Sequence, residues 1–596
     1  MHQALQYIVD PFDLHGHRLR VTLHIPRVAS LDQVVAMPAW IPGSYLIRDF
    51  ARHIETIRGY HNNQWTAPIK LDDHRWVFEG CRGSLTVEIV VYAWDLSVRG
   101  AHVDDTHAFF NGTSVFLLPE GLEQLPCHVQ IKRPTAKRTW RCYTGMPEAK
   151  QPLSARLATT SAASPILGCY EAPDYDALID HPFELGTPQV IEFDACGAKH
   201  QMVFTGYAPN LDLQRVARDT KRICESQIRL FEPETAQAPF LDSAPRYVFM
   251  THVTSDGYGG LEHRASTALV ASRKDLPLRY QAEVPEGYNT FLGLVSHEYF
   301  HTWHVKRIKP AVFVPYDLFR PNHTRLLWVF EGFTSYYDDL MLLRSGVINM
   351  TAYLKLLSKT ISSVHAGSGR LKQSLADSSF DAWTKYYKQD ENAPNAISSY
   401  YAKGSLVALG LDLVIRQRSE LRHSLDDVMQ ALWQRYGQPF YKGKPDGLKE
   451  SELVNLIKDV TQVDVSEEID TWVNQTADVP LPDLLAVEGF DLQWISKDDM
   501  PDLGLTFKTQ GESLVVRQVF EDGAGHRAGL SAGDILVAVN GFRIGNHVTA
   551  LKEALRAYRA GDRVTVHCFR ADCLRTASLQ IQPPAKAACQ ILPLRH

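Results

Sequence analysis

The spacing of apolar residues changes twice along the chain. From the start to about residue 170, apolar and polar residues alternate in short segments, as in residues 19–25 and 84–92, and glycine, proline and asparagine interrupt them. Alternation with a period of two is typical of strands that have one buried face. The first part of the chain is therefore predicted to be an all-β domain that resembles a β-sandwich.

After Pro173 the pattern becomes helical, because apolar residues recur every three to four positions. A strand at residues 201–205 precedes the first helix. Helices are predicted at residues 211–230, 290–307, 326–344, 401–416, 424–436 and 449–460. This pattern indicates a mixed domain whose C-terminal half is helical.

The last hundred residues return to alternation, with clear strands at residues 513–519 and 563–569. A chain of 596 residues is long enough for about three or four domains. We therefore predict a multidomain protein with three domains. Their boundaries are placed at residues 1–172, 173–484 and 485–596.

Composition narrows the class of protein. The charges sum to 62 − 68 = −6, so the chain lacks the positive field that holds nucleic acid. Its first residues lack the pattern of a signal peptide, and its apolar runs are too short to span a membrane. The nine cysteines are scattered without a CxxC pair, which suits neither a disulfide framework nor a thiolate metal site. We expect a cytoplasmic protein with no membrane or nucleic-acid partner.

The strongest chemical signal is a pair of histidines four residues apart, His297 and His301, with Glu298 between them. Four residues are slightly more than one helical turn, so both imidazoles project from one face and can bind one ion. Glu298 is then placed to contact the water on that ion. A catalytic zinc ion usually has three protein ligands, and Glu331 in an apolar helix is the predicted third.

Several polar residues near this motif have more than one interpretation. His304 is three residues after His301 and could reach the site, but we expect a structural role because three ligands suffice. Asp338 either accepts a hydrogen bond from a zinc-binding histidine or faces solvent.

Three cations follow the motif: Lys306, Arg307 and Lys309. We expect them to complement the dipole at the end of the helix, which Pro310 should stop. The alternative is contact with the carboxylate of a short peptide.

Two segments around the motif resemble known sequences. Residues 297–303 (HEYFHTW) and 328–336 (WVFEGFTSY) resemble the zinc helix and the glutamate helix of the gluzincin aminopeptidases. Residues 40–50, 259–263 and 399–404 extend the resemblance to the PDZ-containing glycyl aminopeptidase family. The resemblance implies a thermolysin-like α+β catalytic domain for residues 173–484.

The resemblance also implies an activity. It implies a zinc-dependent aminopeptidase that prefers N-terminal glycine or alanine, with one Zn²⁺ per chain and peptides with a free N-terminus as substrates. The zinc ligands would be His297, His301 and Glu331, and Glu298 would be the general base. The spacing does not distinguish Zn²⁺ from Co²⁺ or Mn²⁺.

Two further roles follow from the same resemblance. Tyr401 would stabilise the oxyanion, with the adjacent Tyr400 as its rival. Glu262 would bind the substrate ammonium group, and Gly259 and Gly260 would permit close approach of a bound peptide. The sequence Gly-Gly-Leu-Glu-His differs here from the Gly-Ala-Met-Glu-Asn of the large gluzincin aminopeptidases, and the 29 residues between His301 and Glu331 exceed their spacer.

The C-terminal domain resembles a PDZ domain at residues 503–506 and 523–541. Such a domain binds an extended C-terminal peptide at a sheet edge while backbone N–H groups hold its carboxylate. The fold alone does not establish a ligand, so the domain either binds such a peptide or only packs on its neighbour. A zinc endopeptidase and an inactive peptidase-like scaffold are the alternatives for the whole chain.

Overall fold

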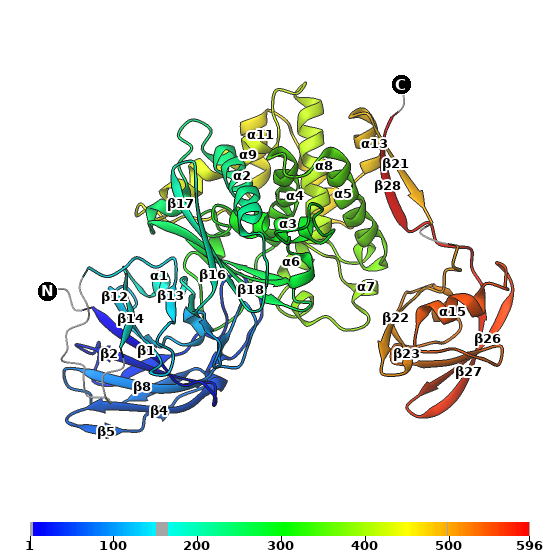
Figure 1. Cartoon of the computed structure of the whole chain (residues 1–596). Coiled ribbons are helices and arrows are strands. Elements are labelled where there is room, and N and C mark those ends of the chain that lie inside the picture. Colours follow the sequence, from blue (N-terminus) through cyan, green and yellow to red (C-terminus); the bar gives the residue numbers. More distant parts are fainter. Residues whose placement is uncertain (1–3, 151–164, 497–498, 595–596) are drawn as a thin grey trace. The chain divides into compact units, whose positions relative to one another are not determined.

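The computed structural model describes residues 4–150, 165–496 and 499–594, whose elements Figure 1 labels. The chain divides into two compact units. The first comprises Met1–Asn322, Tyr337–Ile348 and Met429–Lys449, and the second comprises His323–Tyr336, Asn349–Val428 and Glu450–His596. Among the described residues, no helix combines the length and the apolar composition needed to cross a membrane.

Three sheets form the N-terminal part of the first unit. The largest has the order β14 (Ile166–Ala172), β12 (Cys127–Lys132), β1 (Leu5–Asp13), β2 (Arg18–Ile25), β8 (Leu85–Tyr92), β4 (Ile54–His61) and β5 (Gln64–Thr66). The second has the order β13 (Arg141–Tyr143), β15 (Phe183–Gly186), β10 (Ala108–Phe110) and β9 (Ala101–Val103). The third has the order β11 (Leu118–Pro119), β3 (Gln33–Ala36), β7 (Arg75–Phe78) and β6 (Ile69–Lys70). Buried side chains of all three sheets share one apolar core.

The alternating pattern of the sequence explains this core. In β12, the side chains of Cys127, Val129 and Ile131 are buried, while those between them are partly exposed. A period of two places one set of side chains on the core face of a strand. The two strands predicted at residues 19–25 and 84–92 are confirmed as β2 and β8.

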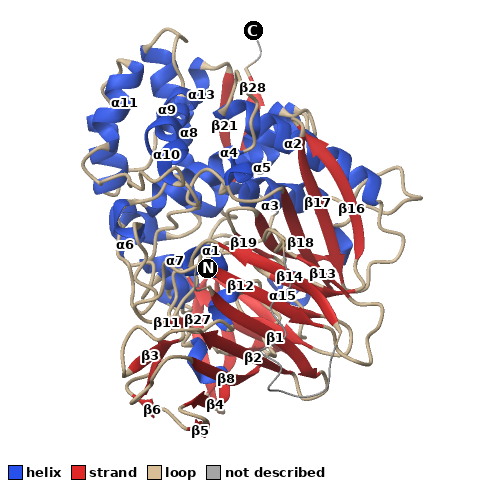
Figure 2. Ribbon diagram, turned by 90° about the vertical axis from the view of Figure 1, so that its left-hand side faces the viewer, coloured by secondary structure: helices blue, strands red, loops and turns tan. Residues whose placement is uncertain are grey.

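A five-stranded sheet follows in the first unit. Its order is β16 (Gln189–Ala195), β17 (Ala198–Thr205), β18 (Arg246–Thr254), β20 (Ser266–Ser272) and β19 (Gly259–Glu262). The three inner strands are parallel, and the edge strand β19 is antiparallel to β20. Helices α2 (Leu213–Phe231) and α3 (Tyr288–Phe300) pack against each other and cover one face of the sheet (Figure 2). Because α3 contacts β19, the sheet edge and the histidine motif are neighbours.

Helix α3 is shorter than the sequence predicted. It begins after Gly287 and ends at Phe300, and the following residues form turns instead of the expected helix to residue 307. The prediction that Lys306, Arg307 and Lys309 complement the helix dipole is therefore wrong.

Each of these three cations is buried and has a tertiary partner. Lys306 Nζ lies 2.6 Å from Asp180, and Arg307 lies 2.6 Å from Asp242. Lys309 Nζ lies 4.6 Å from the ring centres of Tyr316 and Phe440, and burial lowers its pKa to about 7. Ion pairs and cation–π contacts, which sequence spacing does not reveal, decide the conformation of this segment.

Asp180 is the centre of a buried ionic network beside β19. Its carboxylate accepts hydrogen bonds from the backbone N–H and the Nε of Arg264, at 3.0 and 2.9 Å, and pairs with Lys306 and with His263 Nδ1. Burial raises its pKa, but Lys306, His263 and Arg264 outweigh burial and hold the pKa well below its usual range. Removing one member of such a network costs about 3–5 kcal/mol. The network therefore fixes the chain after Glu262 against the chain after α3.

The chain from residue 328 to residue 487 is mainly helical. Its segments are η7 (Trp328–Phe333), α4 (Thr334–Arg344), α5 (Met350–His365), η8 (Ser368–Leu371), α6 (Leu375–Phe380), η9 (Tyr386–Lys388), α7 (Ala393–Ala396), α8 (Ala402–Arg418), α9 (Leu425–Leu432), η10 (Trp433–Gly437), α10 (Gln438–Phe440), α11 (Leu453–Thr461), α12 (Ser466–Ile469), η11 (Asp470–Asn474) and α13 (Leu481–Val487). The helices predicted from residue 326 onward are confirmed, with their ends shifted by a few residues. Segment η7, however, has π-helical hydrogen bonding, which the apolar period does not reveal.

Within the second unit, η7 and α8 meet at two glycines. A Cβ atom added at Gly332 would lie 2.7 Å from the Gly404 Cα, and one added at Gly404 would lie 3.0 Å from the Gly332 Cα. Only glycine permits backbones to approach this closely. The contact holds the residue before Gly332, Glu331, near the start of α8, which Tyr400 and Tyr401 precede.

The C-terminal module of the second unit is a small sheet with two helices. The sheet has the order β22 (Leu505–Gln510), β23 (Ser513–Val519), β24 (Ile535–Val539), β26 (Arg563–Arg570) and β27 (Cys573–Gln580), with β25 (Phe542–Arg543) on β24; the helices are α14 (Ala524–Arg527) and α15 (Val548–Leu555). The predicted strands 513–519 and 563–569 are confirmed as β23 and β26. Figure 1 shows β21 (Phe490–Ile495) beside β28 (Ala588–Pro593), which pair antiparallel and join the two ends of the module.

Candidate metal centre and active site

His297 and His301 lie at the C-terminal end of α3, with their rings on the same side of the helix. Their Nε2 atoms are 3.1 Å apart, and their ring centres are 4.6 Å apart. This is the arrangement that a spacing of four residues predicts for a helix.

In each ring, the hydrogen bond at Nδ1 determines which of the two nitrogens carries the proton. His301 Nδ1 lies 2.7 Å from the His304 carbonyl oxygen, which can only accept, so Nδ1 carries the proton and donates it. His297 Nδ1 donates to Asp338 Oδ2 at 3.0 Å. In the neutral rings, both Nε2 atoms therefore present lone pairs to each other.

This pair of nitrogens fits a divalent cation. Two lone pairs 3.1 Å apart repel, and a cation that both nitrogens bind converts the repulsion into attraction. Two ligands of a tetrahedral zinc ion with bonds of about 2.0 Å lie about 3.3 Å apart. The observed spacing of the Nε2 atoms is close to that value.

A carboxylate is the third donor that the sequence predicts. Glu331, in η7, is 2% exposed, and a cation stabilises a buried carboxylate. Two imidazoles and one carboxylate are a common donor set for catalytic zinc, and the residues present therefore fit the ion.

Asp338 and His304 both act on the orientation of the histidine rings. Asp338 binds the ring of His297, as one of the two interpretations of the sequence predicted, and its backbone carbonyl accepts a hydrogen bond from Ser296 Oγ at 2.8 Å. Burial raises the pKa of Asp338 above its ordinary value, and the hydrogen bond from His297 opposes this rise. His304 contributes its backbone carbonyl to His301, which agrees with the structural role expected for it.

Two buried carboxylates lie beside the histidines. Ligand atoms of Glu262, Glu298 and His301 are also within 4.8 Å of one another. Glu262 is 4% exposed and Glu298 is 5% exposed. The edge strand β19 and helix α3 therefore bring the predicted amine-binding residue and the predicted base together.

The two glycines of β19 have different surroundings. A Cβ atom added at Gly260 would lie 2.1 Å from the Glu298 Oε1 atom, whereas one added at Gly259 would have open space around it. The close approach at Gly260 is therefore to the chain's own Glu298.

Gly43 is a site residue whose role the sequence did not reveal. Its φ is +96°, and a Cβ atom there would lie 2.4 Å from the Glu262 Oε1 atom. That Oε1 atom is buried and accepts no hydrogen bond from the described residues. A buried carboxylate oxygen of this kind is suited to a cationic ligand. The only signal in the sequence was that Gly43 lies in the segment 40–50.

The two candidate tyrosines differ in exposure. Tyr400 is fully buried, and burial, with smaller contributions from Tyr387 and Glu331, raises its pKa well above the ordinary value. Tyr401 is partly exposed, and its hydroxyl lies 3.3 Å from that of Tyr387. Tyr401 also borders a cavity of about 470 Å³.

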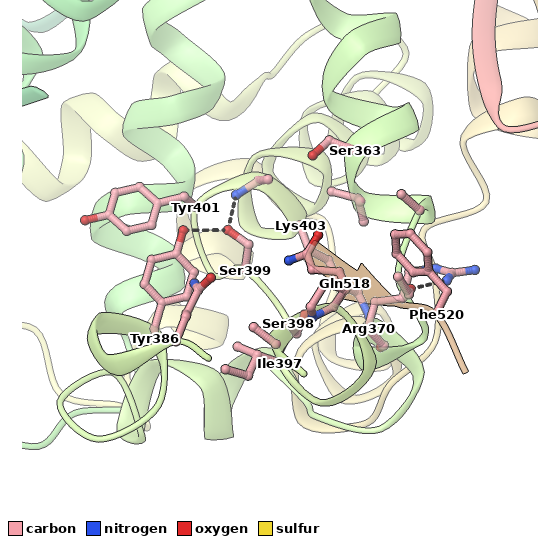
Figure 3. Close-up of a pocket in the computed structure, with 17 residues that line it drawn as sticks. Ser363, Arg370, Tyr386, Ile397, Ser398, Ser399, Tyr401, Lys403, Gln518 and Phe520 are labelled. Atoms are coloured by element: carbon pink, nitrogen blue, oxygen red, sulfur yellow. Dashed lines mark hydrogen bonds between the residues drawn. The ribbon is translucent and has the colours of Figure 1, made fainter. Parts of the chain in front are cut away.

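Figure 3 shows how the Tyr401 side chain lies at this cavity. Its ring is beside Tyr386 and Ser399, and its hydroxyl points away from Lys403 and Gln518. The choice of Tyr401 over Tyr400 stays a prediction.

Three models of known protein families match segments of the chain. A model described as M61 glycyl aminopeptidase matches residues 290–407, and one described as the peptidase M61 N-terminal domain matches residues 6–187. A PDZ domain model matches residues 501–581. No curated protein matches the chain. The predicted fold class, with an all-β N-terminal domain, a helical catalytic region and a C-terminal PDZ domain, is confirmed.

Two solved structures illustrate the similarity. An aminopeptidase N family protein from Idiomarina loihiensis is 39% identical, with a TM-score of 0.91, and the match covers 99% of this chain and 98% of that one. An M1 zinc metallopeptidase from Deinococcus radiodurans is 13% identical, with a TM-score of 0.46, and the match covers 81% of this chain and 95% of that one.

Replacing Asp338 by asparagine should weaken metal binding. The amide can still accept from His297 Nδ1, but it no longer supplies the negative charge that raises the basicity of the ring, so the affinity for zinc should fall about 10–100-fold. Competition with a chromophoric chelator measures this affinity. Asp339→Asn makes the same change of charge one residue later and should keep the wild-type affinity; equal losses in both variants would contradict the role of Asp338.

Proposed function

Since the chain belongs to the M61 glycyl aminopeptidase family, we propose that it is a zinc-dependent aminopeptidase that releases N-terminal residues from peptides. The family resemblance found in the sequence is confirmed, and with it a peptidase. The observation that carries the finer proposal is the position of Glu262. Its buried carboxylate oxygen lies beside Glu298 and His301, where the free ammonium group of a substrate can neutralise it.

The proposed zinc ligands are His297, His301 and Glu331, with one ion per chain. A zinc ion held there supplies a Lewis acid and lowers the pKa of a bound water towards about 7. Asp338 and the His304 carbonyl hold the two rings in the tautomer that exposes Nε2. The ordered rings then need no rearrangement before substrate binds.

Glu298 is the proposed general base. Its carboxylate accepts a proton from the attacking water and later donates that proton to the leaving amine. A carboxylate that is 5% exposed is shielded from bulk water, so the transferred proton stays in the site. The backbone of Gly260 packs on this carboxylate and limits the positions it can take.

Glu262 is the proposed partner of the substrate α-ammonium group. Gly43 packs against its Oε1 atom, and the Asp180 network fixes His263 and Arg264, which follow it. A carboxylate held this rigidly selects substrates by the position of their charge. Peptides with a blocked N-terminus leave that buried charge without a partner and should bind poorly.

Tyr401 is the proposed donor to the oxyanion that forms at the scissile carbonyl. A phenol that meets the carbonyl oxygen as its negative charge grows stabilises the transition state more than the bound substrate. The partial exposure of Tyr401, compared with the full burial of Tyr400, supports this choice. The preference for glycine and alanine is proposed from the family alone.

Cytoplasm is the proposed location. All nine cysteines are free thiols, including Cys224, which is fully buried. Proteins that fold in an oxidising compartment commonly pair their cysteines, whereas a reducing compartment keeps them free.

Amide substrates separate the three candidate activities. Gly- and Ala-p-nitroanilide should be hydrolysed faster than Leu-p-nitroanilide, and N-acetylated peptides should not be cleaved. Glu262→Gln should lower kcat/KM for these substrates about 100-fold, because the ammonium loses its charged partner. Glu298→Gln should keep the metal and lose most turnover. For the wild-type protein, cleavage of internal bonds in an acetylated peptide would instead indicate an endopeptidase. Bound metal without any turnover in the wild type would indicate an inactive scaffold.

The two glycines of β19 give a matched pair of variants. Gly260→Ala places a methyl group where Glu298 Oε1 lies, so kcat should fall about 100-fold while zinc content stays unchanged. Gly259→Ala meets open space and should keep kcat within about threefold. Steady-state kinetics with Ala-p-nitroanilide checks both values. If Gly259→Ala lost as much activity as Gly260→Ala, contact with Glu298 would not be the cause.

We also propose that the PDZ domain binds a C-terminal peptide along β22. This strand lies at the end of its sheet and, in the part of the chain that the structure describes, pairs only with β23, so its outer edge is available for an added strand. The loop before Gly504 and Leu505, which leads into β22, would supply the carboxylate-binding N–H groups. Fluorescence anisotropy should show that free-acid peptides from a C-terminal library bind at least tenfold more tightly than the same peptides with amidated ends. Equal affinities would exclude carboxylate recognition.

A further inference from the structure

A second group of histidine and carboxylate side chains lies in the N-terminal part of the first unit. His102 is in β9, His107 directly precedes β10, and Asp104 lies in the turn between these strands. Their ligand atoms all lie within 4.8 Å of one another. His102 is 4% exposed and His107 is 3% exposed, so this group belongs to the interior of the protein.

The turn holds Asp104 with one oxygen directed to His102. Asp104 Oδ1 accepts hydrogen bonds from the N–H and hydroxyl of Thr106, both at 2.6 Å, and from the His107 N–H at 3.0 Å. Its Oδ2 atom lies 3.3 Å from His102 Nε2. Two ligands of a tetrahedral zinc ion are about 3.3 Å apart, so these two atoms have the spacing of a ligand pair.

His107 is oriented by a second carboxylate. Its Nδ1 atom lies 3.1 Å from Glu184 Oε1 in β15, and both side chains are buried. A carboxylate that accepts the Nδ1 proton leaves Nε2 as a lone pair, which is how metal-binding histidines are commonly held. The His297–Asp338 pair has the same geometry, with a distance of 3.0 Å.

Two buried ring nitrogens in and beside this group have no hydrogen-bond partner from the described residues. His102 Nδ1 and His252 Nδ1 have no hydrogen-bond partner among the described residues. The His252 ring, from β18, stacks on His107 with ring centres 4.9 Å apart. A cavity of about 20 Å³ borders His107, His252 and Glu184, which is room for one water or ion. Of these two nitrogens, the one of His252 belongs to a ring that lines the cavity, and buried nitrogens without partners call for an occupant that the protein does not supply.

We propose that His102, Asp104 and His107 bind a second divalent transition-metal ion, for which zinc is the best match. Imidazole and carboxylate donors suit zinc, and Glu184 holds the His107 ring for the ion. The site is structural. It fastens the β9–β10 turn, because His102 of β9 and His107, the residue before β10, each contribute a ligand, and it lies against β18 of the five-stranded sheet through His252.

The number of metal ions per chain tests this proposal. The full-length protein is loaded with zinc, passed through a desalting column and analysed by elemental mass spectrometry. Wild type should retain two ions per chain, and His107→Gln and Asp104→Asn should each retain one. His24→Gln is the matched control, because His24 lies in the same domain and its ring bonds Thr86 Oγ1 outside the proposed site; it should retain two.

The variant His297→Ala distinguishes metal bound at the catalytic site from metal bound at the second site. This variant should also retain one ion, and adding His107→Gln should remove it. One ion in wild type that His107→Gln leaves in place would overturn the second site, whereas one ion that His107→Gln removes would count against the catalytic zinc instead.

Folding of the variants is controlled in the same preparations. Circular dichroism and gel filtration identify folded monodisperse protein. If His107→Gln does not fold, Asp104→Asn replaces it in the test, because an asparagine side chain can still accept hydrogen bonds in the turn. Cobalt-loaded His297→Ala should show the absorption bands of a tetrahedral cobalt site near the second group. Absence of these bands in folded protein would overturn the proposal.

Discussion

The site depends on one electrostatic constraint: two imidazole nitrogens 3.1 Å apart that both face each other with lone pairs. The hydrogen bonds at their Nδ1 atoms, to Asp338 and to the His304 carbonyl, fix this arrangement. Without a cation, the arrangement is repulsive; with a cation that both nitrogens bind, it becomes attractive. The short helix α3 serves this geometry, because the turns that follow its end at Phe300 place the His304 carbonyl beside His301 Nδ1.

The neighbouring parts of the first unit place two further carboxylates beside this centre. The edge strand β19 brings Glu262 and Glu298 together, and glycine is required at positions 43 and 260 because both carboxylates occupy the space of a side chain. The Asp180 network then anchors the residues after Glu262. A charged residue that recognises an ammonium group must not move to another partner, and buried ion pairs with several hydrogen bonds restrict such movement.

Much of the fold and of the candidate metal centre could be predicted from the sequence, for physical reasons that differ from element to element. The HExxH spacing determines ring positions because a helix is regular, and alternation identified the strands because a buried face repeats every two residues. The end of α3 was not predictable, since Lys306 and Arg307 find their partners more than 60 residues away in the sequence. The role of Gly43 and the group around His102 depend on chain segments that only the folded sheets bring together.

The most direct test of the account is a crystal structure of the zinc-loaded protein with data at the zinc absorption edge. The account predicts an anomalous peak about 2.0–2.2 Å from His297 Nε2, His301 Nε2 and a Glu331 carboxylate oxygen. A structure in which the two histidines bind the ion while the Glu331 carboxylate lies out of bonding range would contradict it. So would zinc-loaded crystals that show no peak between the two rings.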